Sequence, residues 1–135
     1  MIANQHVHVL DEFNEFMEEE IYQMMIATTE DQDELILENT TTLKVARWWD
    51  KACDIIPCNG GKDIGIQKIL DYFNFNKEEA MAFGDGGNDI SMLKYVGTGV
   101  AMGNAKDDVK AIADYITDSV QEDGIVSALK HFDIL

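Results

Sequence analysis

Short apolar runs and amphipathic stretches follow one another at regular spacing in the second half of the chain. Amphipathic stretches predict helices, and short apolar runs bounded by glycine or polar residues predict strands. The helices are predicted over 62–74, 88–96, 106–114 and 123–132, and the strands over 79–85, 97–105 and 115–119. Strands that alternate with helices of about ten residues indicate β-α units and a parallel sheet.

Two of these helices have a clear apolar face. The helix over 88–96 turns Met92 and Leu93 inward. The helix over 62–74 carries five large apolar residues on one face: Ile64, Ile66, Ile69, Leu70 and Phe73. The pattern therefore predicts amphipathic helices beside the sheet.

The first part of the chain has a less regular pattern. It predicts a helix over 11–23, a strand over 21–29 and a helix with an acidic first turn over 30–41. The stretch 42–57 predicts one or two strands, which end at the only proline of the chain. Within it Trp48 and Trp49 are neighbours, so one side chain should face the core and the other an edge.

Composition and charge narrow the functional classes. The 135 residues are 46% hydrophobic and 27% charged, so the chain can bury a core. Ten basic against 26 acidic residues give a net charge of -16, which disfavours nucleic acid and anionic membranes as partners. The same acidity is compatible with a divalent cation site, although most carboxylates are expected at the solvated surface.

The cysteines and the apolar content predict a cytoplasmic protein. Cys53 and Cys58 form no disulfide framework, and their spacing does not match a zinc site. Reduced thiols are typical of the cytosol. The sequence shows no signal peptide and no apolar run approaching the roughly 20 residues that span a bilayer.

The stretch AMAFGDGGNDISML, residues 80–93, is the strongest candidate site. Ligands of parallel α/β sheets bind outside the carboxyl ends of the strands, and this turn falls at such an end. Asp85 stands at the strand tip, suited to a hard cation, and Asp89 follows one helical turn later. Gly86 and Gly87 allow unusual torsions and close approach to a ligand. Ordinary helix capping by Asn88 or Asp89 is the alternative.

An EF-hand calcium site is excluded, and a dinucleotide-binding fingerprint matches the sequence poorly. D-G-G-N-D lacks the alternating acids and the distal Glu of an EF-hand. The stretch GTGVAMG places its third glycine one position too late for a dinucleotide fingerprint.

Four stretches in order, GGKDIGI, FGDGGNDISML, GVAMGNA and DGIVSAL, resemble the haloacid dehalogenase-like hydrolases, and most closely their Cof-type, sugar-phosphate phosphatase branch. The resemblance covers 59–135, and the stretch 42–55 resembles the segment by which the inserted cap domain returns to the core. It implies an α/β fold. Residues 1–57 would be the C-terminal part of an α+β cap, and residues 58–135 the C-terminal half of a Rossmann-like core with parallel strands.

The resemblance also implies a chemistry and assigns residues to it. Members use Mg²⁺ and an aspartate nucleophile to transfer a phosphoryl group from a phosphorylated small molecule. Asp85 would be a metal ligand, and Asp89 would assist directly or through water. Asn88 would contact the substrate phosphate. Lys62 would be a catalytic and substrate-binding residue that holds the phosphoryl oxygens, as suits a point charge.

Two further residues have weaker assignments. Asn104 is expected to shape the loop beside the site. Ser91 is expected to satisfy the N-terminus of the helix over 88–96.

The family's nucleophile motif, D-x-D-G-[TS], is missing from the sequence. The only D-x-D is Asp31-Gln32-Asp33, which lacks the glycine and is better explained as an acidic helix start. We therefore expect a C-terminal half of such an enzyme, inactive or nearly so by itself. Its sheet would have about three parallel strands and an open edge, which predicts self-association.

Two readings from other classes remain. A non-catalytic module that binds Mg²⁺ or a phosphorylated partner would account for the missing nucleophile. A phosphate-receiver domain fits poorly, because Lys62 precedes the acidic turn instead of following it.

Overall fold

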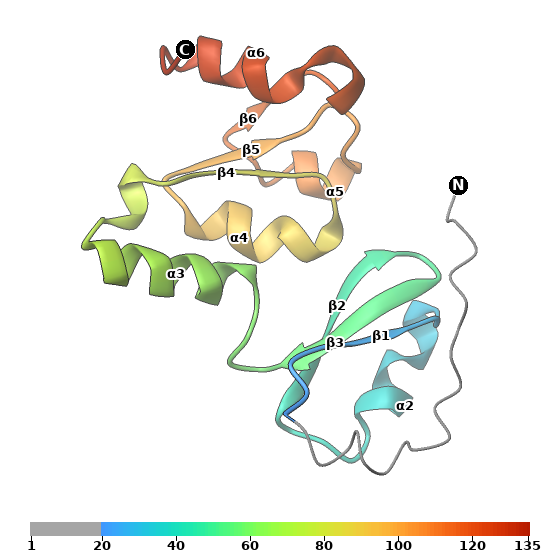
Figure 1. The fold of residues 1–135 in the computed structure, drawn as a ribbon. Coiled ribbons are helices and arrows are strands. Elements are labelled where there is room, and N and C mark those ends of the chain that lie inside the picture. The colour runs from blue at the N-terminus through green and yellow to red at the C-terminus, as the bar shows by residue number, and fades with distance from the viewer. Residues whose placement is uncertain (1–19) are drawn as a thin grey trace.

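The computed structural model describes residues 20–135 and contains two three-stranded sheets (Figure 1). One sheet is antiparallel and comes from residues 24–57. The other is parallel and comes from residues 81–116. Within the described residues no helix is both long and apolar enough to cross a membrane.

The antiparallel sheet has the strand order β1-β3-β2. Its strands are β1 (Met24–Ile26), β2 (Leu43–Trp49) and β3 (Ala52–Pro57). A 3-10 turn (Glu30–Gln32) and α2 (Asp33–Leu37) lie between β1 and β2. The stretch 42–57 therefore forms two strands, joined as a hairpin in which Val45 lies opposite Ile55. Cys53 and Ile55 are buried on β3.

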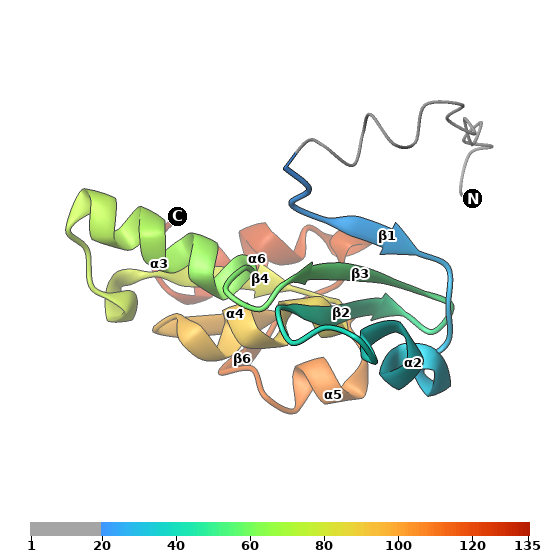
Figure 2. The ribbon, with the colours of Figure 1, turned by 90° about the horizontal axis from the view of Figure 1, so that it is seen from below.

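The parallel sheet confirms the β-α pattern. Its strands are β4 (Met81–Gly84), β5 (Thr98–Ala101) and β6 (Tyr115–Ile116), in the order β4-β5-β6. Its helices are α3 (Lys62–Phe73), α4 (Ile90–Tyr95), α5 (Asp107–Lys110) and α6 (Gly124–His131). Figures 1 and 2 show α4 and α5 on one face of the sheet and α6 on the other, with α3 beside α4.

The core lies between this sheet and α4. Leu93 is 1% exposed and packs with buried residues of β4, β5 and α5: Ala82, Ala101 and Val109. Met92 is partly buried against the same cluster. The inward direction predicted for Met92 and Leu93 is therefore confirmed.

The N-terminal predictions need correction. Residues 11–19 of the predicted helix lie outside the described residues, and residues 20–23 are not helical. The strand predicted over 21–29 is limited to β1, because only three residues pair with β3. The strand ends at Ile26, and the chain enters a 3-10 turn at Glu30.

The expected division of Trp48 and Trp49 between core and edge is wrong. The pairing of β2 with β3 shifts between Arg47 and Trp49, which marks a bulge at Trp48. A bulge breaks the strict alternation of side chains. The two indoles stack with their centroids 6.5 Å apart, Trp48 is half-buried and Trp49 is exposed.

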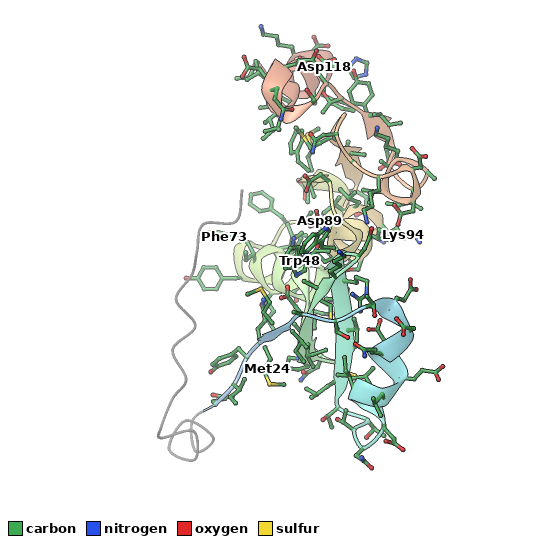
Figure 3. All side chains as sticks on the ribbon, turned by 90° about the vertical axis from the view of Figure 1, so that its right-hand side faces the viewer. Met24, Trp48, Phe73, Asp89, Lys94 and Asp118 are labelled. Carbon is green, nitrogen blue, oxygen red and sulfur yellow. The ribbon has the colours of Figure 1, made fainter. Side chains whose placement is uncertain are left out.

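Much of the apolar face of α3 is open to solvent. The helix has no buried residue among its twelve. Ile66 packs against the core cluster, but Ile69 and Phe73 are 59% and 61% exposed. Figure 3, in which Phe73 is labelled, shows aromatic side chains that project outward from this helix.

The packing of α4 generates a stability prediction. Replacing Leu93 with alanine should lower the free energy of unfolding by about 2–5 kcal/mol, because it leaves a cavity in the core. The same change at the exposed Leu35 on α2 should alter it by less than about 0.5 kcal/mol. Urea denaturation of both variants measures the difference. Equal losses in the two variants would contradict the core described for this sheet.

Candidate active site

The candidate site lies where β4 ends and α4 begins. Asp85 follows the last residue of β4, and a 3-10 turn (Gly87–Asp89) leads into α4. Because β4 and β5 are parallel, their carboxyl ends meet at one edge of the sheet. Asp85 therefore lies at the tip of a strand, as the sequence predicts.

Asp89 is the best-connected side chain of the site. It is only 5% exposed. One carboxylate oxygen, Oδ2, accepts hydrogen bonds from the backbone N–H groups of Asp85 and Gly86, each at 3.0 Å. The other, Oδ1, forms an ion pair with the Nζ of Lys62. Asp89 therefore closes the turn and also fixes a lysine that lies 27 residues earlier.

These contacts set the charge state of Asp89. Burial by itself would raise the pKa of its carboxyl. The hydrogen bonds from Lys62, Gly86 and Asp85, together with the charge of Lys62, outweigh burial and lower this pKa. Asp89 is thus held as a carboxylate beside a cation.

The glycines of the turn provide space. Gly86 has an extended backbone with φ −106°, and Gly61 is the only glycine with a positive φ among the described residues. The unusual torsions expected at Gly86 and Gly87 are therefore absent. A Cβ on Gly84 would lie 2.6 Å from that of Asp89, and one on Gly87 would lie 2.9 Å from the carbonyl oxygen of Arg47.

Asp85 is exposed and is oriented by Asn104. The Nδ2 of Asn104 donates to the Oδ2 of Asp85 at 3.0 Å. The Oδ1 of Asn104 accepts from the backbone N–H of Val120 at 3.1 Å. Asn104 thus shapes the loop, as expected, and also contacts the candidate metal ligand, a role that sequence reasoning missed. Its place just after β5, beside β4, was the available signal.

The four predicted site residues line two adjoining cavities. Lys62, Asp85 and Asp89, together with Asn104, line a cavity of about 450 Å³. Asn88 lines a second cavity of about 610 Å³ between the hairpin and the turn, and Lys62 belongs to both. Ser91 does not cap its helix, because its hydroxyl donates to the Oδ1 of Asp63 on α3 at 3.2 Å.

Comparison with known proteins identifies the family. A family model for haloacid dehalogenase-like hydrolases matches residues 2–129. The chain belongs to this family. Its parallel sheet with flanking helices matches the Rossmann-like core of these enzymes.

Three similar proteins show how much of the chain, and how much of each relative, is matched. YkrA of Bacillus subtilis (strain 168) is 40% identical over 116 residues, which are 86% of this chain and 45% of YkrA. The structure of the HAD subclass IIB sugar phosphatase BT4131 matches at a TM-score of 0.84 and 45% identity, over 91% of this chain and 47% of that one. BT1666 from Bacteroides thetaiotaomicron matches at 0.86 and 37%, over 94% and 47%. The chain thus spans about half the length of these relatives.

The oxygen atoms of Asp85 and Asp89 are of the kind that a hard divalent cation prefers. Mg²⁺ prefers oxygen ligands and uses one or two carboxylates, together with waters and substrate phosphate. Asp85 accepts one hydrogen bond within the described residues, so its carboxylate keeps oxygen capacity. Asp89 has both oxygens engaged. Residues 20–135 contain no group of three or more His, Cys, Asp or Glu side chains that could hold a metal ion.

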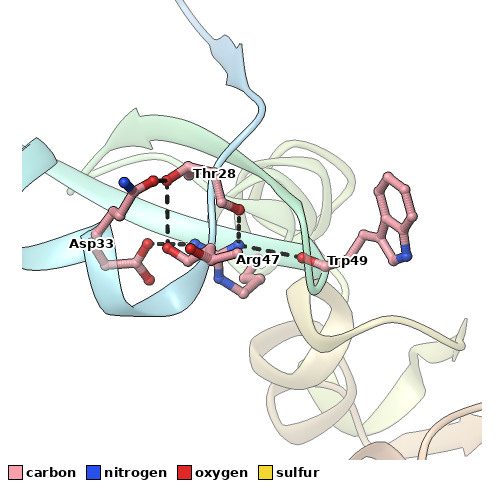
Figure 4. Close-up of polar contacts among 6 residues, drawn as sticks. Thr28, Asp33, Arg47 and Trp49 are labelled. Carbon is pink, nitrogen blue, oxygen red and sulfur yellow. Dashed lines mark hydrogen bonds and ion pairs between the residues drawn. The ribbon is translucent and has the colours of Figure 1, made fainter.

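A polar network in the hairpin was not predicted from the sequence. The guanidinium of Arg47 donates to the carbonyl oxygens of Thr28 at 2.9 Å and Trp49 at 3.3 Å, and it pairs with Asp33 (Figure 4). Asp33 belongs to the only D-x-D of the sequence. This ion pair supports a structural role for the D-x-D motif, because the carboxylate of Asp33 on α2 binds Arg47 on β2.

The lowered pKa of Asp89 predicts a pH dependence of stability. Because its folded pKa lies below the unfolded value of about 3.9, its stabilising contribution is complete above about pH 4. The contribution is lost as pH falls through the lower folded pKa. The free energy of unfolding, measured by urea denaturation between about pH 5 and 2, should fall less steeply in Asp89→Asn than in the parent chain.

Asp71→Asn, at an exposed position on α3, is the matched control and should follow the parent. A slope that is the same for Asp89→Asn and Asp71→Asn would contradict the charge state assigned to Asp89.

Proposed function

We propose that this chain contributes the phosphate- and Mg²⁺-binding half of a phosphatase that acts on phosphorylated small molecules, with sugar phosphates as the substrate class. The ion pair between Lys62 and Asp89 beside Asp85 is the observation that carries the proposal. BT4131, which is named a sugar phosphatase, supports the substrate class. The boundary proposed for the two parts is 1–57 for the cap segment and 58–135 for the core half.

Each site residue then has a distinct role. Lys62 lines both cavities, and its Nζ would bind the phosphoryl oxygens while Asp89 holds it in place. Asp85, oriented by Asn104, would hold Mg²⁺. Asn88 would contact the phosphate from the neighbouring cavity. When bound, Mg²⁺ supplies charge stabilisation for the transferring phosphoryl group.

The nucleophile is not supplied by the motif that the family uses. The only D-x-D of the chain ends at Asp33, whose carboxylate pairs with Arg47. We therefore propose that the chain binds Mg²⁺ and phosphate but does not by itself complete the phosphoryl transfer. This observation also favours the second candidate function, a non-catalytic module that binds Mg²⁺ or a phosphorylated partner.

The free cysteines and the net charge of the chain bear on its proposed location and partners. Cys53 and Cys58 are both free, which supports a cytoplasmic location. The net charge of -16 disfavours nucleic acid and anionic membranes as partners.

A Mg²⁺ titration followed by NMR tests the proposal. The amide signals of residues 84–91 should shift saturably at millimolar Mg²⁺, because the carboxylate of Asp85 borders these amides. Asp85→Asn should weaken the binding at least tenfold, since it removes the charged ligand. Asp71→Asn should leave it unchanged.

Phosphate release from glucose 6-phosphate by the same samples separates the two candidate functions. Saturable shifts without release support a half-site that needs a nucleophile from elsewhere. Release that is abolished in Asp85→Asn would show that the chain is active alone. Flat shifts at millimolar Mg²⁺ would contradict the metal assignment to Asp85.

We further propose self-association through the edge of β4. The carbonyl oxygens of Ala80 and Gly84 accept from Thr98 and Met102, toward β5. The alternating backbone groups of β4 therefore point to the other edge, where no strand is paired among the described residues. Part of the apolar face of α3 is also open to solvent, and its segment 62–73 is charge-balanced, with two lysines and two aspartates.

Sedimentation velocity tests this association. The parent chain should form dimers at about 100 μM, and Phe73→Asp should shift it to monomer by placing a charge on the apolar face. Leu35→Asp makes the same kind of change on the exposed surface of α2 and should not alter the distribution. A monomeric parent chain across this concentration range would contradict the proposal.

A further inference from the structure

The cavity between the hairpin and the acidic turn is basic in an acidic protein. The chain has 10 basic and 26 acidic residues. The lining of the 610 Å³ cavity nevertheless includes three basic residues, Lys44, Arg47 and Lys62, and a single acidic one, Asp54. Ligand cavities of this kind usually measure about 300–1,000 Å³, so the volume suits a small phosphorylated molecule.

The three cations of this cavity are not equivalent. The two terminal nitrogens of the Arg47 guanidinium are engaged by Asp33 and by the carbonyl oxygens of Thr28 and Trp49, while its Nε is buried without a hydrogen-bond partner among the described residues. Lys62 is paired with Asp89. Lys44 has no ion-pair partner among residues 20–135 and is half-buried on β2. Among the described residues, Lys44 is therefore the basic residue of this cavity that has no ion pair.

The backbone places Lys44 close to the candidate phosphate site. On β2, Lys44 and Ala46 point to the same face of the strand, and both line this cavity. The Nζ of Lys44 lies 3.5 Å from the position that a Cβ on Gly61 would take, next to the residue that starts α3. Lys44 and Lys62 thus border one cavity from two different elements, β2 and α3.

We propose that Lys44 is a specificity-determining residue that binds a second anionic group of the substrate, in addition to the phosphate held at Lys62. The substrate class narrows from sugar phosphates to sugar phosphates that carry another negative charge, either a carboxylate or a second phosphate. This inference rests on the proposed function for the position of the first phosphate. Asp54 on β3, which lies opposite Ala46, also lines the cavity. Its negative charge disfavours an anionic group beside it, so the second anionic group of the substrate is expected at Lys44.

Binding of three ligands to the chain in the presence of Mg²⁺ tests the inference. Dissociation constants are measured by NMR titration for glucose 6-phosphate, 6-phosphogluconate and glucose 1,6-bisphosphate. At least one of the two ligands with an additional anionic group should bind about tenfold more tightly than glucose 6-phosphate. The preferred ligand identifies the second group as a carboxylate or as a phosphate.

Two matched variants assign this preference to Lys44. Lys44→Met should bring the three dissociation constants to within about twofold of one another, because the added charge of the ligand loses its partner. Lys51→Met removes the same charge from the exposed hairpin turn and should retain the preference. Backbone amide spectra of each variant check that the hairpin is folded.

The outcomes distinguish the inference from the proposed function. Binding of glucose 6-phosphate without any preference among the three ligands overturns the role of Lys44 and leaves the proposed function standing. A preference that survives in Lys44→Met also overturns that role. Absence of binding for all three ligands overturns the phosphate site at Lys62 and, with it, the inference.

Discussion

The site depends on one buried carboxylate. Asp89 is shielded from water, so its charge would be costly without partners. Two backbone N–H groups and Lys62 supply them, and these partners belong to the end of β4 and the start of α3. The same contacts that stabilise the charge therefore fix the distance between the two elements. A lysine that binds phosphate needs this fixed position, because its long side chain is otherwise flexible.

Close packing around the turn connects the two sheets. Gly87 leaves room for the carbonyl oxygen of Arg47, so β2 approaches the start of α4. The guanidinium of Arg47 meanwhile ties β2 to α2 through Asp33. The exposed pair between Lys106 and Asp50, at 2.6 Å, adds a second link, although exposed ion pairs contribute little to stability. The cavity between hairpin and turn is the space that these contacts enclose.

The parallel sheet is small for the helices that surround it. Three short strands cover part of the faces offered by α3 and α6, and large apolar side chains remain in water on both helices. The chain also spans about half the length of its relatives. Both observations agree with a surface at β4 and α3 that another polypeptide segment can cover. The candidate site residue Asp85 lies at the carboxyl end of that same strand.

The sequence determined the parallel β-α order and the positions of Lys62, Asp85 and Asp89, because local periodicity and turn composition act over a few residues. It did not predict the contact of Asn104 with Asp85, the bulge at Trp48 or the Arg47 network. Nor did it show that Ile69 and Phe73 remain exposed. Each of these depends on which strands are neighbours and on what covers a helix. Such contacts join residues far apart in the chain, and only the tertiary structure decides them.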